Sequence, residues 1–487
     1  MTTAPTAPAA PHGPTVAQRP TAPVRTAPTP AGRSVGRRNR LVADLVSALV
    51  AASLTVVVVL WVAGGGLTAL TIATGAALTS LGRLTGLVSS DLLLLQVLAM
   101  ARIPVVERAL GQDRLARWHR VLGFTSFTLL LGHIGLVTVG YAATTRTGVL
   151  RQLWDLVWTY PGMLLATAGT AALVMVVVTS VRAARRRLRY ESWHLLHLYA
   201  YLGVGLALPH QLWTGADFVA SPAARAYWWA LYLGTLAAVV AFRVALPAYR
   251  NLRHRLVVRA VVDEAPGVVS LHLGGRHLDR IGARPGQFFV WRFLDGPGWS
   301  RGNPYSLSAP VRHDRMRVTV KDLGEGSRRL AEIRPGTRVL VEGPYGALTA
   351  DRRTRPRVTL IGAGIGITPL RAIAEDLDLP PGDVTLVHRA GDESDLVLRA
   401  ETEELARTRG IRLMHLVGPR PGGATRSWLP AHLAHVGDVE ALRRIAPDIA
   451  RQDVFVCGPD GWMATVEEAL AAAGVPRSQV HVEHFSW

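Results

Sequence analysis

Long apolar runs separated by short polar breaks dominate the first half of the chain. Each of six runs holds about 17–23 residues, enough for a helix to cross a hydrocarbon core of about 30 Å at about 1.5 Å per residue. A seventh stretch, Gly65–Ser80, is shorter and rich in glycine and threonine, so we expect a loop or a re-entrant segment there. The six runs are Leu41–Ala63, Leu84–Met100, Val121–Gly140, Met163–Ser180, Leu195–Trp213 and Ala226–Leu246.

Arginine is distributed unevenly between the polar breaks. The connection Ala101–Arg120 holds five arginines, and further arginine clusters follow the fourth and the last apolar run. The alternate breaks, Tyr141–Leu156 and Thr214–Pro222, hold only Arg146 and Arg151. Since basic loops remain in the cytoplasm, both termini and everything after the last run are predicted to be cytoplasmic. The chain is therefore expected to be a multi-pass protein of the cell membrane, with the lipid bilayer as its first partner.

Composition agrees with a membrane protein and excludes several other classes. Of 487 residues, 49% are hydrophobic and 18% charged, which is unlike a disordered chain or an ordinary soluble enzyme. The net charge of +19 is almost wholly arginine, because Lys321 is the only lysine. Since those arginines follow the membrane topology, no nucleic-acid partner is expected. The single cysteine, Cys457, excludes a disulfide framework and a cluster held by the chain's own thiolates.

Composition also divides the chain into four parts. Residues 1–40 are rich in Pro, Ala and Thr and contain no acidic residue, so we expect a disordered basic tail. Residues 41–248 form the predicted transmembrane unit. Residues 249–352 show short β-branched runs between Gly/Pro turns, which is typical of a small antiparallel β-barrel. In residues 353–487 strand and helix patterns alternate, as in an α/β nucleotide-binding domain. The predicted fold is multidomain: a six-helix transmembrane bundle, an antiparallel barrel and an α/β domain.

Four histidines lie in or directly beside the third and fifth apolar runs: His119 and His133, and His197 and His210. An imidazole in hydrocarbon is costly unless it has a partner, so intramembrane histidines are functional candidates. Fourteen residues make about 21 Å of helix and leave His133 within roughly 40° of His119 in azimuth. Two such helices facing each other would offer one His–His pair near each membrane surface, a ligand set that suits two haems.

The histidines of the fifth run fit this geometry less well. Thirteen residues rotate His210 about 140° away from His197 in an ideal helix, unless Pro209 bends it. His194 lies on the same turn as His197 and competes with it as a ligand. The alternative is that the histidines are hydrogen-bonded packing residues of a transporter-like bundle.

These histidines and their neighbours resemble those of the ferric reductase/NADPH oxidase superfamily. The similar segments are Ala101–Pro104, Arg117–Arg120 with His133, and Tyr190–His197 with His210. The resemblance implies two b-type haems. His119 and His197 would hold one on the cytoplasmic side, and His133 and His210 the other on the outer side.

Two segments of the predicted barrel resemble the flavin site of ferredoxin reductase-like domains. In the signature that Asn303–Ser306 resembles, an aromatic ring covers the isoalloxazine and a hydroxyl reaches the flavin. Asn303 stands where that signature has Arg or His, and Arg301 is the candidate replacement. Lys321–Ser327 resembles the flavin-phosphate segment, with Ser327 expected to cap a helix that begins at Arg328. The FAD-binding residues implied are Pro304, Tyr305, Ser306, Lys321, Gly324 and Ser327.

A glycine-rich turn follows the predicted strand Val358–Leu360. Such a turn lets backbone amides approach a dinucleotide pyrophosphate, and Gly362–Pro369 resembles the Gly-x-Gly-x-x-Pro turn of ferredoxin reductase-like domains. Arg389 follows the next strand and favours a 2′-phosphate, so NADPH is preferred and NADH remains possible. The NADPH-binding residues implied are Gly362, Gly364, Gly366, Thr368, Pro369, Arg389, Gly458 and Pro459.

Two motifs near the C-terminus extend the same resemblance. Cys457–Gly458–Pro459 is similar to the family motif beside the nicotinamide, which gives Cys457 a positioning role; the alternative is an inert buried thiol. Trp487 is similar to a terminal aromatic that stacks on the flavin and shifts for hydride transfer.

The expected function is electron transfer across the membrane. Electrons from cytosolic NADPH would pass through FAD, which accepts two and releases them singly, and two b-type haems to a ferric chelate or molecular oxygen at the outer face. The alternatives are a reductase of a quinone or another redox protein, and a transporter-like bundle with structural histidines and a regulatory nucleotide domain.

Overall fold

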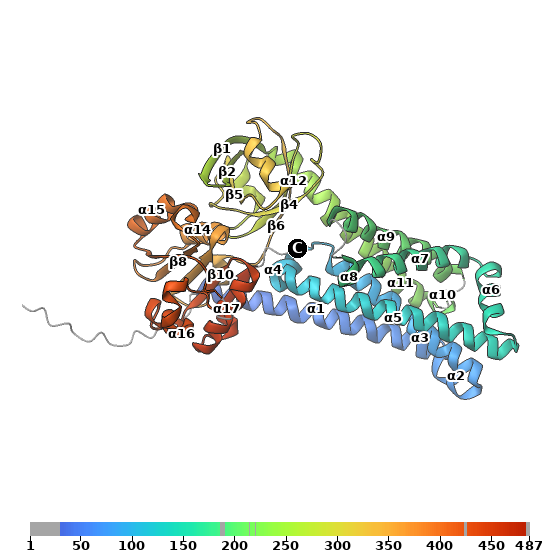
Figure 1. The fold of residues 1–487 in the computed structure, drawn as a ribbon. Helices are drawn as coiled ribbons and strands as arrows, with labels where there is room; N and C mark the ends of the chain where they lie inside the picture. The colour runs from blue at the N-terminus through green and yellow to red at the C-terminus, as the bar shows by residue number, and fades with distance from the viewer. Residues whose placement is uncertain (1–29, 186–189, 214, 220, 423–425, 484–487) are drawn as a thin grey trace, which may run out of the picture.

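The computed structural model of the chain describes residues 30–185, 190–213, 215–219, 221–422 and 426–483. Figure 1 shows a long helical bundle formed by residues 30–254, with a strand-rich module at one end of it. This C-terminal module comprises residues 257–483 and has two parts, each with its own sheets. The two halves of the chain are thus built from different elements and meet at one junction.

The bundle consists of long helices joined by short ones. The first helix begins at Pro30, so residues 30–40 are helical and do not belong to the disordered tail predicted for them. Residues 1–29, the rest of that tail, lie outside the described residues. The helices are α1 (Pro30–Ala63), α2 (Gly66–Ile72), α3 (Thr74–Ala99), α4 (Pro104–Leu110), α5 (Gln112–Thr145), α6 (Val149–Thr159), α7 (Met163–Ser180), α8 (Arg182–Arg185), α9 (Tyr190–Trp213), α10 (Ala216–Val219), α11 (Pro222–Val239), the π-helix η1 (Val240–Ala245) and α12 (Leu246–His254).

Five helical segments of the described residues are long and apolar enough to cross a membrane: Arg37–Ala63, Thr74–Ala99, Arg114–Thr145, Met163–Ser180 and Pro222–His254. The predicted fifth run lies in α9, which has 24 residues but is not among these five. Its histidines and Gln211 make it less apolar than the others, so the predicted count of six is not confirmed. The stretch Gly65–Ser80, for which a loop or a re-entrant segment was expected, contains the short helix α2 and the first residues of α3, which begins at Thr74.

Glycines allow the long helices to pack closely. A Cβ added to Gly82 of α3 would lie 2.7 Å from the Val137 side chain of α5 and 2.9 Å from its backbone nitrogen. Between α7 and α9, a Cβ on Gly169 would lie 2.7 Å from the carbonyl of Gly203. Small residues at such contacts let helix backbones approach, which replaces the apolar driving force that is missing between helices in lipid.

The first part of the C-terminal module contains two three-stranded antiparallel sheets, ordered β1-β2-β5 and β4-β3-β6. Phe289, Trp291 and Phe293 alternate along β3 and point into a core that both sheets share. Single bridges join the sheets, but the described ladders do not close into the one continuous barrel that was predicted. The strands are β1 (Val257–Ala265), β2 (Val268–Gly274), β3 (Phe288–Phe293), β4 (Asn303–Ser306), β5 (Arg315–Lys321) and β6 (Val339–Tyr345), with the helix α13 (Glu325–Arg328).

The second part is a five-stranded parallel sheet with helices on both faces, ordered β11-β10-β7-β8-β9. Helices α14 and α15 cover one face and α16 and α17 the other, each with its own apolar core. This is the α/β arrangement expected from the sequence. The elements are β7 (Val358–Ala363), α14 (Ile367–Asp376), β8 (Val384–Ala390), α15 (Arg399–Arg409), β9 (Arg412–Val417), α16 (Asp438–Ile445), β10 (Asp453–Cys457), α17 (Asp460–Ala472) and β11 (Val480–Glu483). Short 3₁₀ helices are η2 (Leu278–Ile281), η3 (Arg329–Glu332), η4 (Ala350–Arg352), η5 (Gly364–Gly366), η6 (Glu393–Asp395), η7 (Ala431–Val436), η8 (Ile449–Arg451) and η9 (Arg477–Gln479).

Strand β6 holds the module against the bundle. Asn251 of α12 exchanges two hydrogen bonds with the backbone of Val341, at 2.8 and 2.9 Å. Arg243 of η1 forms an ion pair with Glu342 at 3.0 Å. Arg102, which precedes α4, stacks over the ring of Tyr345 at 4.0 Å. Three separate elements of the bundle therefore bind one strand of the module.

Candidate functional site

The first histidine pair joins α5 to α9. The ring centroids of His119 and His197 lie 5.8 Å apart, with an angle of 63° between the ring planes. On α9, His197 therefore faces His119. This favours His197 over His194 as the ligand. Trp193 packs against the His197 ring at 4.9 Å and helps to fix its orientation.

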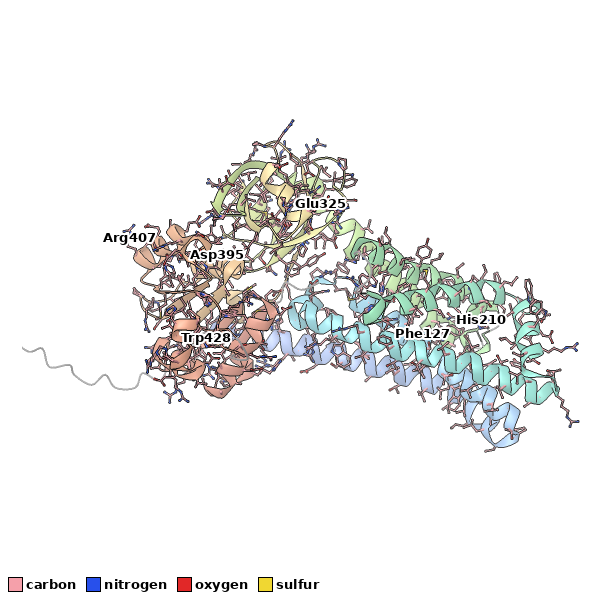
Figure 2. All side chains as sticks on the ribbon, in the orientation of Figure 1. Phe127, His210, Glu325, Asp395, Arg407 and Trp428 are labelled. Atoms are coloured by element: carbon pink, nitrogen blue, oxygen red, sulfur yellow. The ribbon has the colours of Figure 1, made fainter. Side chains whose placement is uncertain are left out.

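The second pair joins the same two helices farther along the bundle. The ring centroids of His133 and His210 lie 6.4 Å apart. Figure 2 shows His210 in the half of the bundle that is remote from the C-terminal module. An ideal helix would not have aligned His197 and His210, but α9 contains Pro209 and both its histidines face α5. The structure thus brings together all four histidines in the two pairs expected.

Two backbone carbonyls and one hydroxyl contact the Nδ1 atoms of three of these rings. The Nδ1 atom of His133 lies 2.8 Å from the carbonyl oxygen of Gly82, and that of His119 lies 3.3 Å from the carbonyl oxygen of Gln96. A carbonyl only accepts, so Nδ1 carries the proton in both rings and Nε2 keeps its lone pair. The Nδ1 atom of His197 lies 3.3 Å from the Ser180 hydroxyl. Hydrogen bonds of this kind to the Nδ1 atom are how proteins orient imidazoles whose Nε2 atom binds a metal.

The spacing of each pair suits one metal ion between two imidazoles. Metal–imidazole bonds of about 2.0–2.1 Å, together with the half-widths of two rings, place opposing centroids roughly 6 Å apart. The observed 5.8 and 6.4 Å agree with that value. Room for the rings depends on glycine: a Cβ on Gly86 would lie 2.5 Å from His133 Nδ1. The residues present therefore fit haem iron with two axial histidines at both levels.

The flavin signature lies on β4, and several of its polar atoms lack partners. Among the described residues, the buried Asn303 Nδ2, Ser306 Oγ and Arg329 Nη2 atoms form no hydrogen bond. Burial raises the pKa of the half-buried Tyr305 to about 12, so its ring is neutral. Orphaned donors and acceptors around an aromatic ring fit a polar ligand such as FAD. Arg329 was not expected from the sequence, because no motif marks it among the many arginines.

The proposed flavin-phosphate segment differs in detail from its prediction. Helix α13 begins at Glu325, with Gly324 at φ +150° before it, so Ser327 lies within the helix and does not cap it. The Ser327 hydroxyl instead accepts a hydrogen bond from the Leu323 amide at 2.8 Å. Lys321 reaches the other part of the module, 3.4 Å from Asp395. Arg301, the candidate substitute, lies 3.9 Å from Glu325.

The glycine-rich turn lies at the carboxyl end of β7, as predicted. Gly364 has φ +53°, and a Cβ on Gly366 would collide with the carbonyl of Cys457. Thr368 and Pro369 form the first turn of α14 and are buried. Gly362 is in register with Cys457 of β10, so the turn and the Cys457–Gly458–Pro459 motif share one sheet edge. A pyrophosphate at this edge would meet exposed amides at a helix start.

Of the remaining predicted residues, the structure describes the surroundings of Cys457 and Arg389. The Cys457 thiol is fully buried, and this burial raises its pKa, so the group is a neutral thiol. Arg389 is also buried and donates hydrogen bonds to the carbonyls of Ala390, Leu416 and Pro419, which braces the loop after β9. Strand β11 ends at Glu483, in register with Cys457. Trp487 lies outside the described residues.

Two protein families match separate parts of the chain. The family described as ferric reductase like transmembrane component matches residues 85–208, which include all four paired histidines. The family described as oxidoreductase NAD-binding domain matches residues 360–468, which include the glycine turn and Cys457. The bundle is therefore a ferric reductase-like membrane domain, and the chain is an oxidoreductase.

Curated relatives match about half of the chain. The ferredoxin reductase component of 3-ketosteroid-9-alpha-monooxygenase from Rhodococcus rhodochrous is 32% identical, over 47% of this chain and 64% of that protein. The glycine betaine monooxygenase reductase subunit from Chromohalobacter salexigens is 29% identical, over 50% and 67% respectively. The chain thus spans about two thirds or less of these relatives. A crystal structure of the FAD/NAD-binding domain of nitric oxide dioxygenase from Vibrio cholerae is 27% identical, with a TM-score of 0.38, over 47% of this chain and 97% of that one.

Proposed function

We propose that this chain, which joins a ferric reductase-like transmembrane component to an oxidoreductase NAD-binding domain as the ferric reductase/NADPH oxidase superfamily does, transfers electrons across a membrane. The donor is cytosolic NADPH, and the cofactors are FAD and two b-type haems. The acceptor is a one-electron acceptor at the outer face, either a ferric chelate or molecular oxygen.

The two stacked histidine pairs carry this proposal. Structural histidines would need only hydrogen-bond partners, whereas these rings face each other at metal-binding distance, and in His119 and His133 the carbonyl contact at Nδ1 leaves the Nε2 lone pair for a metal. Two pairs on the same two helices give two sites at different depths. Bound haem would supply one-electron chemistry at each site, which a protein side chain does not.

The topology of the bundle supports delivery to the opposite side. The start of α1 and the C-terminal module lie at the same end of the bundle (Figure 1), which requires an even number of crossings. Helix α9 would supply the sixth crossing beside the five apolar helices. The module would then lie in the cytoplasm, where the arginine-rich breaks lie.

The module's residues have separable tasks in this proposal. Tyr305 covers one flavin face, while Asn303, Ser306 and Arg329 supply donors to polar flavin groups. The glycine turn at Gly362–Gly366 exposes amides for the nucleotide pyrophosphate. Cys457 positions the nicotinamide ring by packing, since its buried neutral thiol is a poor nucleophile. Arg389 stiffens the loop after β9 through its hydrogen bonds to three backbone carbonyls.

A second acceptor class is suggested by the curated relatives. Two of them are named as reductase components of monooxygenases, proteins that pass electrons to a separate partner. The alternative function is therefore the reduction of another redox protein or a quinone. Under this alternative the same NADPH, FAD and haem sites remain, and only the last step differs.

The test follows haem absorbance in the full-length protein in detergent or nanodiscs. NADPH added without oxygen should reduce the haem bands only when FAD is bound, and admission of oxygen or ferric citrate should reoxidise them. The compound that reoxidises the haem faster identifies the acceptor. If neither oxygen nor ferric citrate reoxidises the protein, a separate redox partner is favoured. If no haem copurifies when haem is supplied during expression, the histidine pairs are structural and the proposal is wrong.

A further inference from the structure

Three consecutive polar residues in the middle of α3 connect it to four other helices. Ser89 donates a hydrogen bond to the carbonyl of Ser126 in α5 at 2.6 Å. Ser90 accepts one from Gln211 of α9 at 3.1 Å. Asp91 receives hydrogen bonds from α1 and α11. This mid-membrane layer lies between the two histidine levels, because α3 meets His133 at Gly82 and His119 at Gln96.

Asp91 is the acidic member of the layer and is completely buried. Its Oδ1 atom lies 2.6 Å from the Ser53 hydroxyl of α1 and 2.8 Å from the Tyr227 hydroxyl of α11. These two hydroxyls also lie 2.8 Å from each other. The Oδ2 atom is buried and has no hydrogen-bond partner in the described part of the chain. One carboxyl oxygen is thus saturated and the other is unused.

No basic side chain among the described residues forms an ion pair with Asp91. Among the described residues, its neighbours on α1 and α11 are the neutral Ser53 and Tyr227, and α9 reaches the layer through the neutral amide of Gln211. None of the ion pairs in the described residues includes Asp91, whereas Glu107, another buried acidic residue of the bundle, is paired with Arg102 at 2.9 Å. An unpaired carboxylate away from water costs several kcal/mol, so an occupant must neutralise it.

The spacing of the oxygen atoms decides between a metal ion and a proton. Hard cations bind oxygen at about 2.0–2.6 Å, so neighbouring ligands around one cation are about 3 Å or more apart. The Asp91, Ser53 and Tyr227 oxygens are only 2.6–2.8 Å from one another. The two contacts to Asp91 Oδ1 are at the distance of hydroxyl hydrogen bonds, each with one hydroxyl proton between the oxygens, and the three oxygens are too close together to surround one cation.

We propose that Asp91, Ser53 and Tyr227 form a proton-binding site in the middle of the membrane, in which Asp91 is a neutral carboxylic acid at neutral pH. The proton comes from water and forms an O–H bond at Oδ2, while Oδ1 remains the acceptor for both hydroxyls. The site needs no haem. The carboxylate form of Asp91 would appear only when this proton leaves. The site therefore holds one proton between the two histidine levels.

Infrared spectroscopy of the full-length protein in lipid tests this directly. Wild-type protein at neutral pH should show the carbonyl stretch of a protonated carboxylic acid, and 13C-labelled aspartate should shift it. Asp91→Asn should abolish the band, because asparagine is a near-isosteric neutral replacement. Tyr227→Phe should keep the band but raise its frequency, because one donor to Oδ1 is lost.

Asp44→Asn is the matched control, because Asp44 is an exposed aspartate on α1. This variant should leave the band unchanged. The proposal is overturned if substitution of Asp91 changes only carboxylate bands, or if the protonated band appears only after sodium is removed, which would mean a bound cation. If Asp91→Asn does not fold, the isotope shift in wild-type protein and the response to Tyr227→Phe still decide the matter.

Discussion

The bundle and the C-terminal module differ in which side chains they bury and which they expose. In the module, large apolar side chains such as Trp428, Phe289 and Phe455 are completely buried, and the surface is charged. In the bundle, leucines and tryptophans such as Leu195 and Trp118 are at least half exposed, and the interior holds histidine, serine and aspartate beside a small apolar cluster that includes Trp228. Water drives apolar groups inward, whereas lipid provides no such drive and leaves polar contacts and close backbone packing to hold the helices. The proposed function follows the same division, since the four histidines proposed as haem ligands lie between helices of the bundle.

The histidine pairs give the largest expected effect. His197→Leu should remove an axial ligand and lose one of the two haem equivalents, and with it NADPH-driven reduction of the outer acceptor. His194→Leu, one turn away, should keep both haems. Haem content and the reduced-minus-oxidised spectrum of the two purified variants test this. Equal haem loss in both variants, or haem loss only in His194→Leu, would reassign the ligand.

The contrast between the two solvents predicts unequal costs for removing tryptophan. Trp428→Ala empties a fully buried site in the module and should destabilise it by about 3–5 kcal/mol. Trp118→Ala removes a ring that is 50% exposed on the bundle and should cost much less. Thermal unfolding of both variants in the same detergent measures the difference. Similar losses would show that Trp118 is not a lipid-facing side chain.

Close helix packing predicts that some glycines of the bundle are indispensable. Gly86→Ala would push into the His133 ring and should destabilise the bundle by about 1–3 kcal/mol and lower haem content at the outer pair. Gly132→Ala is the control, because a Cβ there meets nothing within 4 Å. The control should be neutral or slightly stabilising, since alanine favours helix. Haem occupancy and melting temperature distinguish the two variants, and identical behaviour would contradict the packing argument.

The module also contains a buried histidine, His388, which has no role in the proposed reaction. Its burial predicts that the stability of the module depends on pH. His388 of β8 is fully buried next to His415 of β9, with centroids 6.0 Å apart, and neither of its ring nitrogens has a partner in the described residues. Burial first, and then the charge of His415, lower the pKa of His388 from its usual 6.5 to about 3. Below pH 6.5 His388 therefore binds a proton in the unfolded chain but stays neutral in the folded module.

The free energy of unfolding of the module should accordingly fall by about 1.4 kcal/mol per pH unit as the pH drops from 6.5 toward 3. His388→Leu should reduce this slope, and His435→Gln, at an exposed position, should keep it. Denaturant unfolding of the full-length protein at several pH values, followed by the fluorescence of the module, measures the slope. An unchanged slope in His388→Leu would assign the acid sensitivity to other groups.

The sequence by itself determined the features that are periodic or local. Apolar runs about twenty residues long predict membrane helices because the bilayer fixes their length, and five of them are helices that qualify as spans. The glycine turn after β7 and the alternation of strands and helices around it were also readable, because φ values and backbone approach at Gly364 and Gly366 demand glycine. The four histidines stood out because imidazole is rare in hydrocarbon.

Tertiary structure alone decided which groups meet. Ideal helix geometry set His197 and His210 on different faces, whereas in the structure both rings lie against histidines of α5. Arg329 and the three-helix contact of Asp91 carry no sequence motif, since their partners come from distant segments. The cap predicted at Ser327 failed because α13 starts at Glu325, a shift of less than one turn. Length, period and special backbone angles are local quantities, whereas pairing across helices depends on the sum of many packing contacts along the whole chain.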